Sequence, residues 1–227
     1  MGLQLNTIIP WGRNLDEYVA MFGLDAQALK LNILDCAAGL ASFNAEMTVR
    51  GHRVTSWDPI YQFSTDEIAQ RIQDTYPTVI SGVRANLESY VWQTLKSPDH
   101  LGEVRMAAMQ RFLEDFPAGL SQGRYLRAAL PQLPGSAQHF DLALCSHFLF
   151  TYSDQLSQPF HRDSVLELCR VAREVRVFPL LTLSGEPSPF LEPILAELSD
   201  AGYNYRIQPV AYEFQRGSNR MLQIYRS

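Results

Sequence analysis

Two acidic residues flank a turn of small residues in the first third of the sequence. Asp35 follows a largely apolar run at residues 31–34, the turn CAAGLA occupies residues 36–41, and Asp58 follows a second short apolar run. Small residues let backbone N–H groups approach a ligand closely, and an acid about twenty positions further on can accept hydrogen bonds from two ribose hydroxyls. Residues 31–63 are therefore predicted to bind a ligand that contains a nucleoside.

Two parallel strands joined by a helix would bring these residues together. Residues 31–34 and 53–57 have the composition of short strands, and the stretch between the turn and the second strand is compatible with a helix. In open parallel sheets, ligands bind in the crevice beyond the carboxyl ends of the strands, because the loops that follow neighbouring strands meet there. The turn and Asp58 are therefore expected at the same edge of one sheet.

The spacing of the small residues indicates which nucleoside is bound. A dinucleotide fingerprint reads G-x-G-x-x-G, whereas Ala37, Gly39 and Ala41 fall at every second position, with Asp35 two residues before the first of them. In this pattern the sequence resembles the class I S-adenosylmethionine-dependent methyltransferases, whose first motif is an acid followed by three alternate glycines. Two of those glycines are alanine here. Since alanine rarely adopts a positive φ, Ala37 and Ala41 are expected to have ordinary backbone conformations.

The resemblance implies both a fold and a cofactor. The fold is α/β: a Rossmann-like three-layer sandwich with a mostly parallel seven-stranded sheet, a C-terminal antiparallel hairpin and a helical insertion. S-adenosylmethionine is the implied cofactor, and Ile60 would lie against its adenine ring. Many related enzymes have an acid after the third strand, where this chain has Ala128 and Ala129. The implied cofactor contacts are Asp35, Ala37, Gly39, Asp58, Pro59, Ile60, Ala129 and Ser146.

The order of the predicted elements supports the resemblance, which covers roughly residues 31–63 and 124–226. A single domain is expected over residues 1–227, with an N-terminal cap helix within residues 1–30 and a helical insertion at residues 64–120 that is either a substrate lid or an oligomer contact. Capping residues and apolar spacing predict helices at residues 14–22, 159–173 and 189–201. Within the insertion, one helix is expected to start at residue 64, and the helical pattern of residues 77–119 is expected to start a new helix at residue 97. Strands are expected at residues 124–130, 140–150 and 174–183, with a hairpin over 203–214 and 220–225.

The carboxyl end of the fourth strand would face the methyl group and the acceptor. His147 is the best-placed candidate for a general base, because its side chain titrates near neutral pH. A histidine at this strand end could instead hold Ser146 or the following loop in place. Tyr152 is a second catalytic candidate, or a packing residue. The candidates for substrate contact are Trp11, Arg13, Tyr18 and Phe148, although aromatic residues at helical spacing more often belong to the core.

Composition and missing motifs limit the chemical class of the methyl acceptor. The net charge is −5 and the basic residues are scattered, which disfavours a nucleic acid partner. Residues 146–149 read SHFL, where enzymes that methylate the exocyclic amines of DNA bases have an acid or asparagine followed by Pro-Pro-aromatic. A small-molecule acceptor is therefore expected, and the oligomeric state stays open. A non-catalytic S-adenosylmethionine-binding module is an alternative, and a nicotinamide-dependent reductase is a less favoured one.

The remaining residue types argue against a metal and a membrane. No Cys-x-x-Cys or Cys/His ligand spacing occurs, so no metal is expected. Cys36, Cys145 and Cys169 each lie in apolar sequence, which is typical of buried, reduced thiols. The sequence begins without the features of a secretory signal and contains no apolar run of membrane-spanning length. A cytoplasmic protein with no membrane partner is expected.

Overall fold

The structure is a computed structural model that describes residues 11–226, so residues 1–10 of the predicted N-terminal cap lie outside the described residues. It contains one seven-stranded sheet in the order β3-β2-β1-β4-β5-β7-β6. The strands are β1 (Ile33–Cys36), β2 (Val54–Trp57), β3 (Tyr125–Leu126), β4 (Phe140–Ser146), β5 (Ala172–Phe178), β6 (Asn204–Pro209) and β7 (Arg220–Tyr225). β1 to β5 are parallel, and β7 runs antiparallel between β5 and β6.

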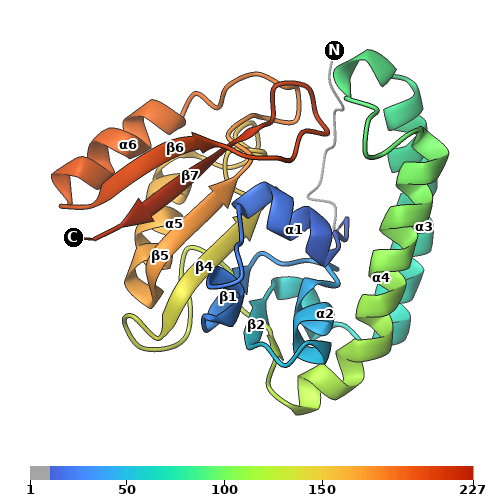
Figure 1. Cartoon of the computed structure of the whole chain (residues 1–227), viewed down its shortest axis with the longest axis horizontal. Helices are drawn as coiled ribbons and strands as arrows, with labels where there is room; N and C mark the ends of the chain where they lie inside the picture. Colours follow the sequence, from blue (N-terminus) through green and yellow to red (C-terminus); the bar gives the residue numbers. More distant parts are fainter. Residues whose placement is uncertain (1–10, 227) are drawn as a thin grey trace.

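Helices cover both faces of the sheet, which makes the three layers predicted (Figure 1). The helices are α1 (Leu15–Phe22), α2 (Phe43–Val49), α3 (Thr65–Arg84), α4 (Pro98–Ser121), α5 (Gln158–Val171) and α6 (Leu191–Asp200). One core lies between the sheet and α1 and α2, and a second lies between the sheet and α5 and α6. The predicted Rossmann-like three-layer fold with its closing antiparallel hairpin is thus confirmed.

Local capping signals set the helix starts that the sequence predicts. In α1 the Asn14 side chain accepts from Glu17 N at 2.9 Å, Glu17 accepts from Asn14 N at 3.2 Å, and Gly23 ends the helix with φ 58°. Ser64 and Glu67 form the same reciprocal cap at the start of α3. Such caps satisfy backbone N–H groups that have no partner within the helix, so they act without help from distant residues.

The helical insertion between β2 and β3 departs from the prediction. Pro77 lies within α3, which is one continuous 20-residue helix, and the helix predicted from residue 77 does not continue to residue 97, because α3 ends at Arg84. Val91 N instead donates to Phe214 O at 2.7 Å, in the loop before β7. Tertiary pairing with the C-terminal hairpin thus overrides a local apolar period. α3 and α4 form an antiparallel pair beside the sheet (Figure 1).

Three predicted strands are shorter in the structure. β3 contains only Tyr125–Leu126, since it pairs with β2 alone at the sheet edge and residues 128–130 then turn away. β4 ends at Ser146 instead of residue 150, because His147 and Phe150 have positive φ values of 51° and 63°. β5 ends at Phe178 instead of residue 183. Each shortening releases residues that follow a strand into the loops at its carboxyl end.

The three cysteines are free and buried, as predicted. Within residues 11–226, no helix is both long and apolar enough to cross a membrane.

Candidate functional site

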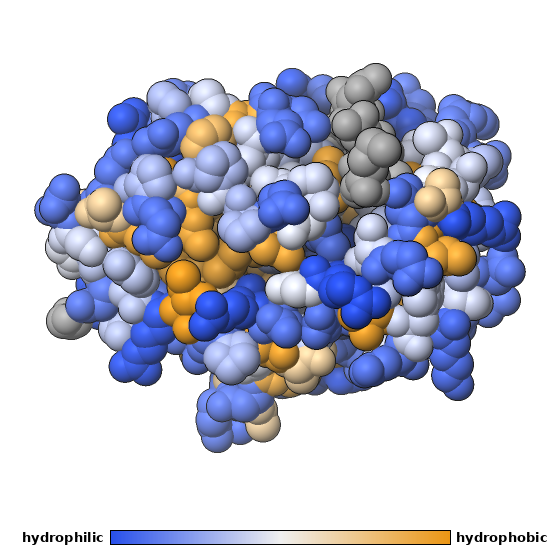
Figure 2. All heavy atoms as spheres, turned by 90° about the horizontal axis from the view of Figure 1, so that it is seen from above, coloured by the Kyte–Doolittle hydropathy of each residue, from blue (hydrophilic) through white to orange (hydrophobic). Residues whose placement is uncertain are grey.

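A cavity lies at the carboxyl ends of β1, β2 and β4. Its volume is about 870 Å³, within the roughly 300–1,000 Å³ of typical small-molecule sites. Figure 2 looks toward this end of the molecule and shows apolar patches interrupted by hydrophilic side chains. The lining residues that the sequence predicted are Trp11, Arg13, Tyr18, Ala37, Gly39, Asp58, Pro59, Ile60, Ala129, Ser146, His147, Phe148 and Tyr152.

The loop after β1 adopts a strained backbone. Ala37 has φ 53° and Gly39 has φ 56°, so the expectation of an ordinary conformation is wrong for Ala37, whereas Ala41 has no positive φ. A left-handed conformation costs a non-glycine residue about 1–2 kcal/mol. Ala37 N donates to Trp57 O at 2.9 Å, and the Tyr61 hydroxyl donates to Gly39 O at 2.9 Å. These contacts to β2 and to the residues after it offset the strain and fix the loop against the cavity.

Asp58 joins the loops that follow β1 and β2. Its Oδ2 accepts from Gly39 N at 2.9 Å and its Oδ1 accepts from Ile60 N at 2.8 Å. Burial raises the pKa of Asp58 to about 6, and the hydrogen bonds from Ile60 and Gly39 oppose that rise. Asp58 lines the cavity. Above about pH 6 its carboxylate is charged, and it has lone pairs left to accept further hydrogen bonds.

Asp35 has a different position from the other predicted contacts. It is 1% exposed within β1, and it is not among the residues that line the cavity. The Tyr18 hydroxyl donates to both of its carboxylate oxygens, at 3.1 and 3.2 Å, and burial raises the pKa of Asp35 well above its usual value. Tyr18, and not Asp35, lines the cavity. The Tyr18 ring stacks on the Phe43 ring, with the ring centroids 4.4 Å apart. The contribution of Asp35 is to hold that tyrosine.

His147 follows β4 directly, and the Nδ1 side of its ring contacts Ser146. Its Nδ1 lies 2.9 Å from Ser146 Oγ, and its backbone N donates to Phe178 O at 2.6 Å. Burial lowers the pKa of His147 well below its usual value, and the positive charges of Arg13 and Arg105 lower it further. The imidazole is therefore neutral at physiological pH, as a proton acceptor must be.

The N-terminal segment crosses the loop after β1 at close range. A Cβ on Gly12 would lie 2.3 Å from the Leu40 carbonyl oxygen, so only glycine fits there. Ser42 N donates to Arg13 O at 3.0 Å, which fixes the segment just before α1. This crossing brings Trp11 and Arg13 to the cavity wall, where Trp11 packs against Tyr76 of α3 with ring centroids 5.9 Å apart.

A buried ion pair lies behind this segment. Arg105 of α4, 1% exposed, forms an ion pair with Glu17 of α1. The Tyr212 hydroxyl donates to the other Glu17 oxygen at 3.1 Å. Burial tends to raise the pKa of Glu17, but Arg105 outweighs it and the pKa is lowered. The three residues join α1, the insertion and the loop before β7.

One wall of the cavity was not predicted from the sequence. Arg71, Asp74, Thr75 and Thr78 share one face of α3 at helical spacing, and Arg71 lies 3.9 Å over the Phe63 ring. This polar face was readable as a pattern, but nothing in the sequence placed it on the wall of the cavity. The lining residues that were not predicted are Cys36, Ala38, Ala41, Gln62, Phe63, Arg71, Asp74, Thr75, Thr78, Val79, Ala128, Leu130, Thr151 and Leu183. Among residues 11–226, no group of three or more His, Cys, Asp or Glu residues could hold a metal ion.

One archaeal protein matches along its whole length. An uncharacterised protein of Methanocaldococcus jannaschii, MJ0045, is 34% identical over 225 residues, which cover 99% of each chain. No family model matches the sequence.

Solved structures of S-adenosylmethionine-dependent methyltransferases resemble the chain more distantly. Magnesium protoporphyrin IX methyltransferase from Synechocystis, solved with S-adenosylhomocysteine, is 16% identical with a TM-score of 0.47, over 88% of this chain and 77% of that one. A TehB-like methyltransferase from Corynebacterium glutamicum is 12% identical with a TM-score of 0.46, over 87% and 80%. Likeness at this level carries no argument about activity, which must come from the residues of the site.

Proposed function

We propose that this chain, which belongs to the family of the Methanocaldococcus jannaschii protein MJ0045, is an S-adenosylmethionine-dependent methyltransferase with a small-molecule acceptor. One observation carries the proposal: the Gly39 N–H of the loop after β1 donates to Asp58 at the end of β2, on the wall of a cofactor-sized cavity. The alternate spacing of Ala37, Gly39 and Ala41 favours this cofactor over a dinucleotide.

The residues present fit the cofactor. Asp58 would accept hydrogen bonds from the ribose, with Pro59, Ile60 and Ala129 around the base, while Ser146 and His147 lie at the next strand end. The cofactor supplies an activated methyl group when bound. The protein then has to align an acceptor and exclude water, and no covalent enzyme intermediate is needed.

His147 is the proposed general base. With the proton on Nδ1, the ring donates to Ser146 Oγ and leaves Nε2 to accept a proton from the acceptor. Burial keeps the ring neutral and able to accept a proton, but the lowered pKa makes His147 a weaker base than the near-neutral titration expected from the sequence would give. Tyr152 lines the same part of the cavity and is the second candidate.

The proposed acceptor is small and partly apolar. Trp11, Phe148 and Tyr152 give the cavity aromatic walls, and the protein carries a net charge of −5. α3 contributes a wall, which favours a lid over an oligomer contact as the role of the helical insertion.

Binding of S-adenosylhomocysteine tests the cofactor. Titration calorimetry of the wild type and Asp58→Ala should show a loss of about 1.5–3 kcal/mol, the contribution of a hydrogen bond to a charged group. Asp200→Ala, which removes an exposed carboxylate at the end of α6, is the matched control and should bind normally. Equal affinity of the wild type and Asp58→Ala would refute the role of Asp58. Binding of NAD(H) without binding of S-adenosylhomocysteine would favour the reductase.

A non-catalytic binding module is the second candidate, favoured by the alanines at positions 37 and 41 and by Ala128 and Ala129 in place of an acid. Incubation with a radioactive methyl donor and a small-molecule cell extract separates the two. Labelled product that disappears in His147→Ala supports the enzyme. Binding of the cofactor with no labelled product supports the module.

A further inference from the structure

Arg13 lines the cavity, and not all of the N–H donors of its guanidinium have a hydrogen-bond acceptor. Its Nη1 donates to Trp11 O at 3.1 Å, two residues away, and its Nε is buried without a partner. Across residues 11–226, no carboxylate forms an ion pair with it. A desolvated guanidinium without a counter-charge is expensive, and arginine presents a planar fork that matches a carboxylate.

The surrounding charges do not compensate Arg13. The carboxylate that acts on it is Glu17, which already pairs with Arg105. Arg105 is a second cation, and together with burial it lowers the pKa of Arg13. Tyr18 and Tyr212 stay neutral because burial raises the pKa of both hydroxyls. One net positive charge therefore remains in this wall, beside neutral His147.

We propose that Arg13 is an anion-binding residue that takes a carboxylate of a ligand in the cavity. The inference rests on the proposed function for the identity of the ligand, but not for its charge. Two ligands could bring a carboxylate to this wall: the cofactor, through its amino-acid end, and an acceptor that is an organic acid. The same ion pair would form in either case, and the buried Nε would gain an acceptor.

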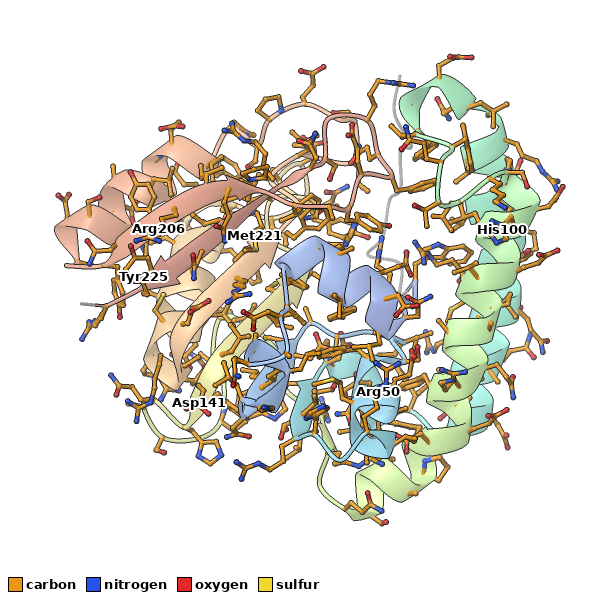
Figure 3. All side chains as sticks on the ribbon, in the orientation of Figure 1. Arg50, His100, Asp141, Arg206, Met221 and Tyr225 are labelled. Carbon is orange, nitrogen blue, oxygen red and sulfur yellow. The ribbon has the colours of Figure 1, made fainter. Side chains whose placement is uncertain are left out.

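Ligand pairs that differ in the carboxylate distinguish the two sources. S-adenosylhomocysteine is compared with 5′-methylthioadenosine, which lacks the amino-acid end, and benzoate is compared with neutral benzamide. Each is titrated against the wild type, Arg13→Gln and Arg13→Lys. Arg50→Gln removes an arginine at the end of α2, outside the cavity lining, and is the matched control (Figure 3).

If the cofactor supplies the carboxylate, Arg13→Gln binds S-adenosylhomocysteine about ten- to a hundredfold more weakly and 5′-methylthioadenosine normally. If the acceptor supplies it, S-adenosylhomocysteine binds normally and the preference of the wild type for benzoate over benzamide is lost. Arg13→Lys retains part of either effect, since it keeps the charge without the fork. Unchanged affinities for all four ligands in Arg13→Gln would overturn the proposal.

Stability measurements keep the result interpretable. Removing an uncompensated buried cation should leave the melting temperature of the ligand-free protein unchanged or higher in Arg13→Gln, whereas a purely structural arginine would lower it. The benzoate comparison needs no cofactor. If the wild type failed to bind S-adenosylhomocysteine but Arg13 still selected benzoate, the proposed function would fail and the anion site would stand.

Discussion

Substitution of Asp58 by asparagine should change how the stability of the protein depends on pH. In the folded protein Asp58 titrates at about 6, against an ordinary value of 3.8, because burial outweighs the hydrogen bonds from Gly39 and Ile60. The folded state therefore binds the Asp58 proton more tightly than the unfolded state does. This contribution to stability is fully present below about pH 4 and is lost as the pH rises through about 6.

The magnitude follows from the difference between the two values. It is about 2 pH units, and at about 1.4 kcal/mol for each unit it corresponds to about 3 kcal/mol. The asparagine side chain in Asp58→Asn would have no such titration. It would keep one oxygen acceptor but turn an amide NH₂ toward one of the two backbone N–H groups, at a cost of about 1–3 kcal/mol that does not vary with pH.

Urea unfolding at several pH values between 4 and 8 measures both effects. The stability of the wild type relative to Asp58→Asn should fall by about 2.5 kcal/mol across this range. Burial also raises the pKa of Asp35, and this effect is common to both proteins, whereas the smaller rise caused by the Asp58 charge is removed in Asp58→Asn. Asp200→Asn should parallel the wild type. A constant difference between the wild type and Asp58→Asn over the whole range would refute the reasoning.

Three further changes follow from the site. His147→Gln should lower turnover of an identified acceptor by about a hundredfold or more with S-adenosylhomocysteine affinity kept, and wild-type activity should show no histidine titration between about pH 6 and 8, since the pKa of His147 is lowered well below that range. Gly12→Ala puts a Cβ 2.3 Å from Leu40 O, so calorimetry should show weaker cofactor binding. Glu17→Gln leaves Arg105 buried without its counter-charge, which should lower the free energy of unfolding in urea by about 3–5 kcal/mol; adding Arg105→Met should recover most of that loss.

Features that depend on neighbouring residues could be predicted from the sequence. The caps at Asn14 and Ser64 involve partners three residues away, and the structure has both. The alternation of small residues located the loop after β1, and Asp58 lies where its spacing from Gly39 predicted. The order of strands and helices followed from apolar periodicity and from the limited number of ways in which parallel strands can be connected.

Backbone conformations that tertiary contacts impose could not be predicted in this way. Ala37 was expected to avoid a positive φ because of its Cβ. In the structure, the hydrogen bond from Ala37 N to Trp57 O holds the residue at a positive φ. Val91 was likewise expected in a helix, but its N–H donates to Phe214 O in the loop before β7. In both cases a contact between segments outweighs a local preference, which for the positive φ of Ala37 is about 1–2 kcal/mol.

The electrostatics of the proposed active site depend on still longer separations. Glu17 pairs with Arg105, 88 positions away, and accepts from Tyr212, 195 positions away. Arg105 belongs to the helical insertion, so the insertion supplies the counter-charge that α1 needs and a cation that adds to the effect of burial on the pKa of His147. Deleting α3 and α4 would leave Glu17 buried without that partner and would remove one wall of the cavity. The insertion is therefore a structural part of the site and cannot be treated as a separable module.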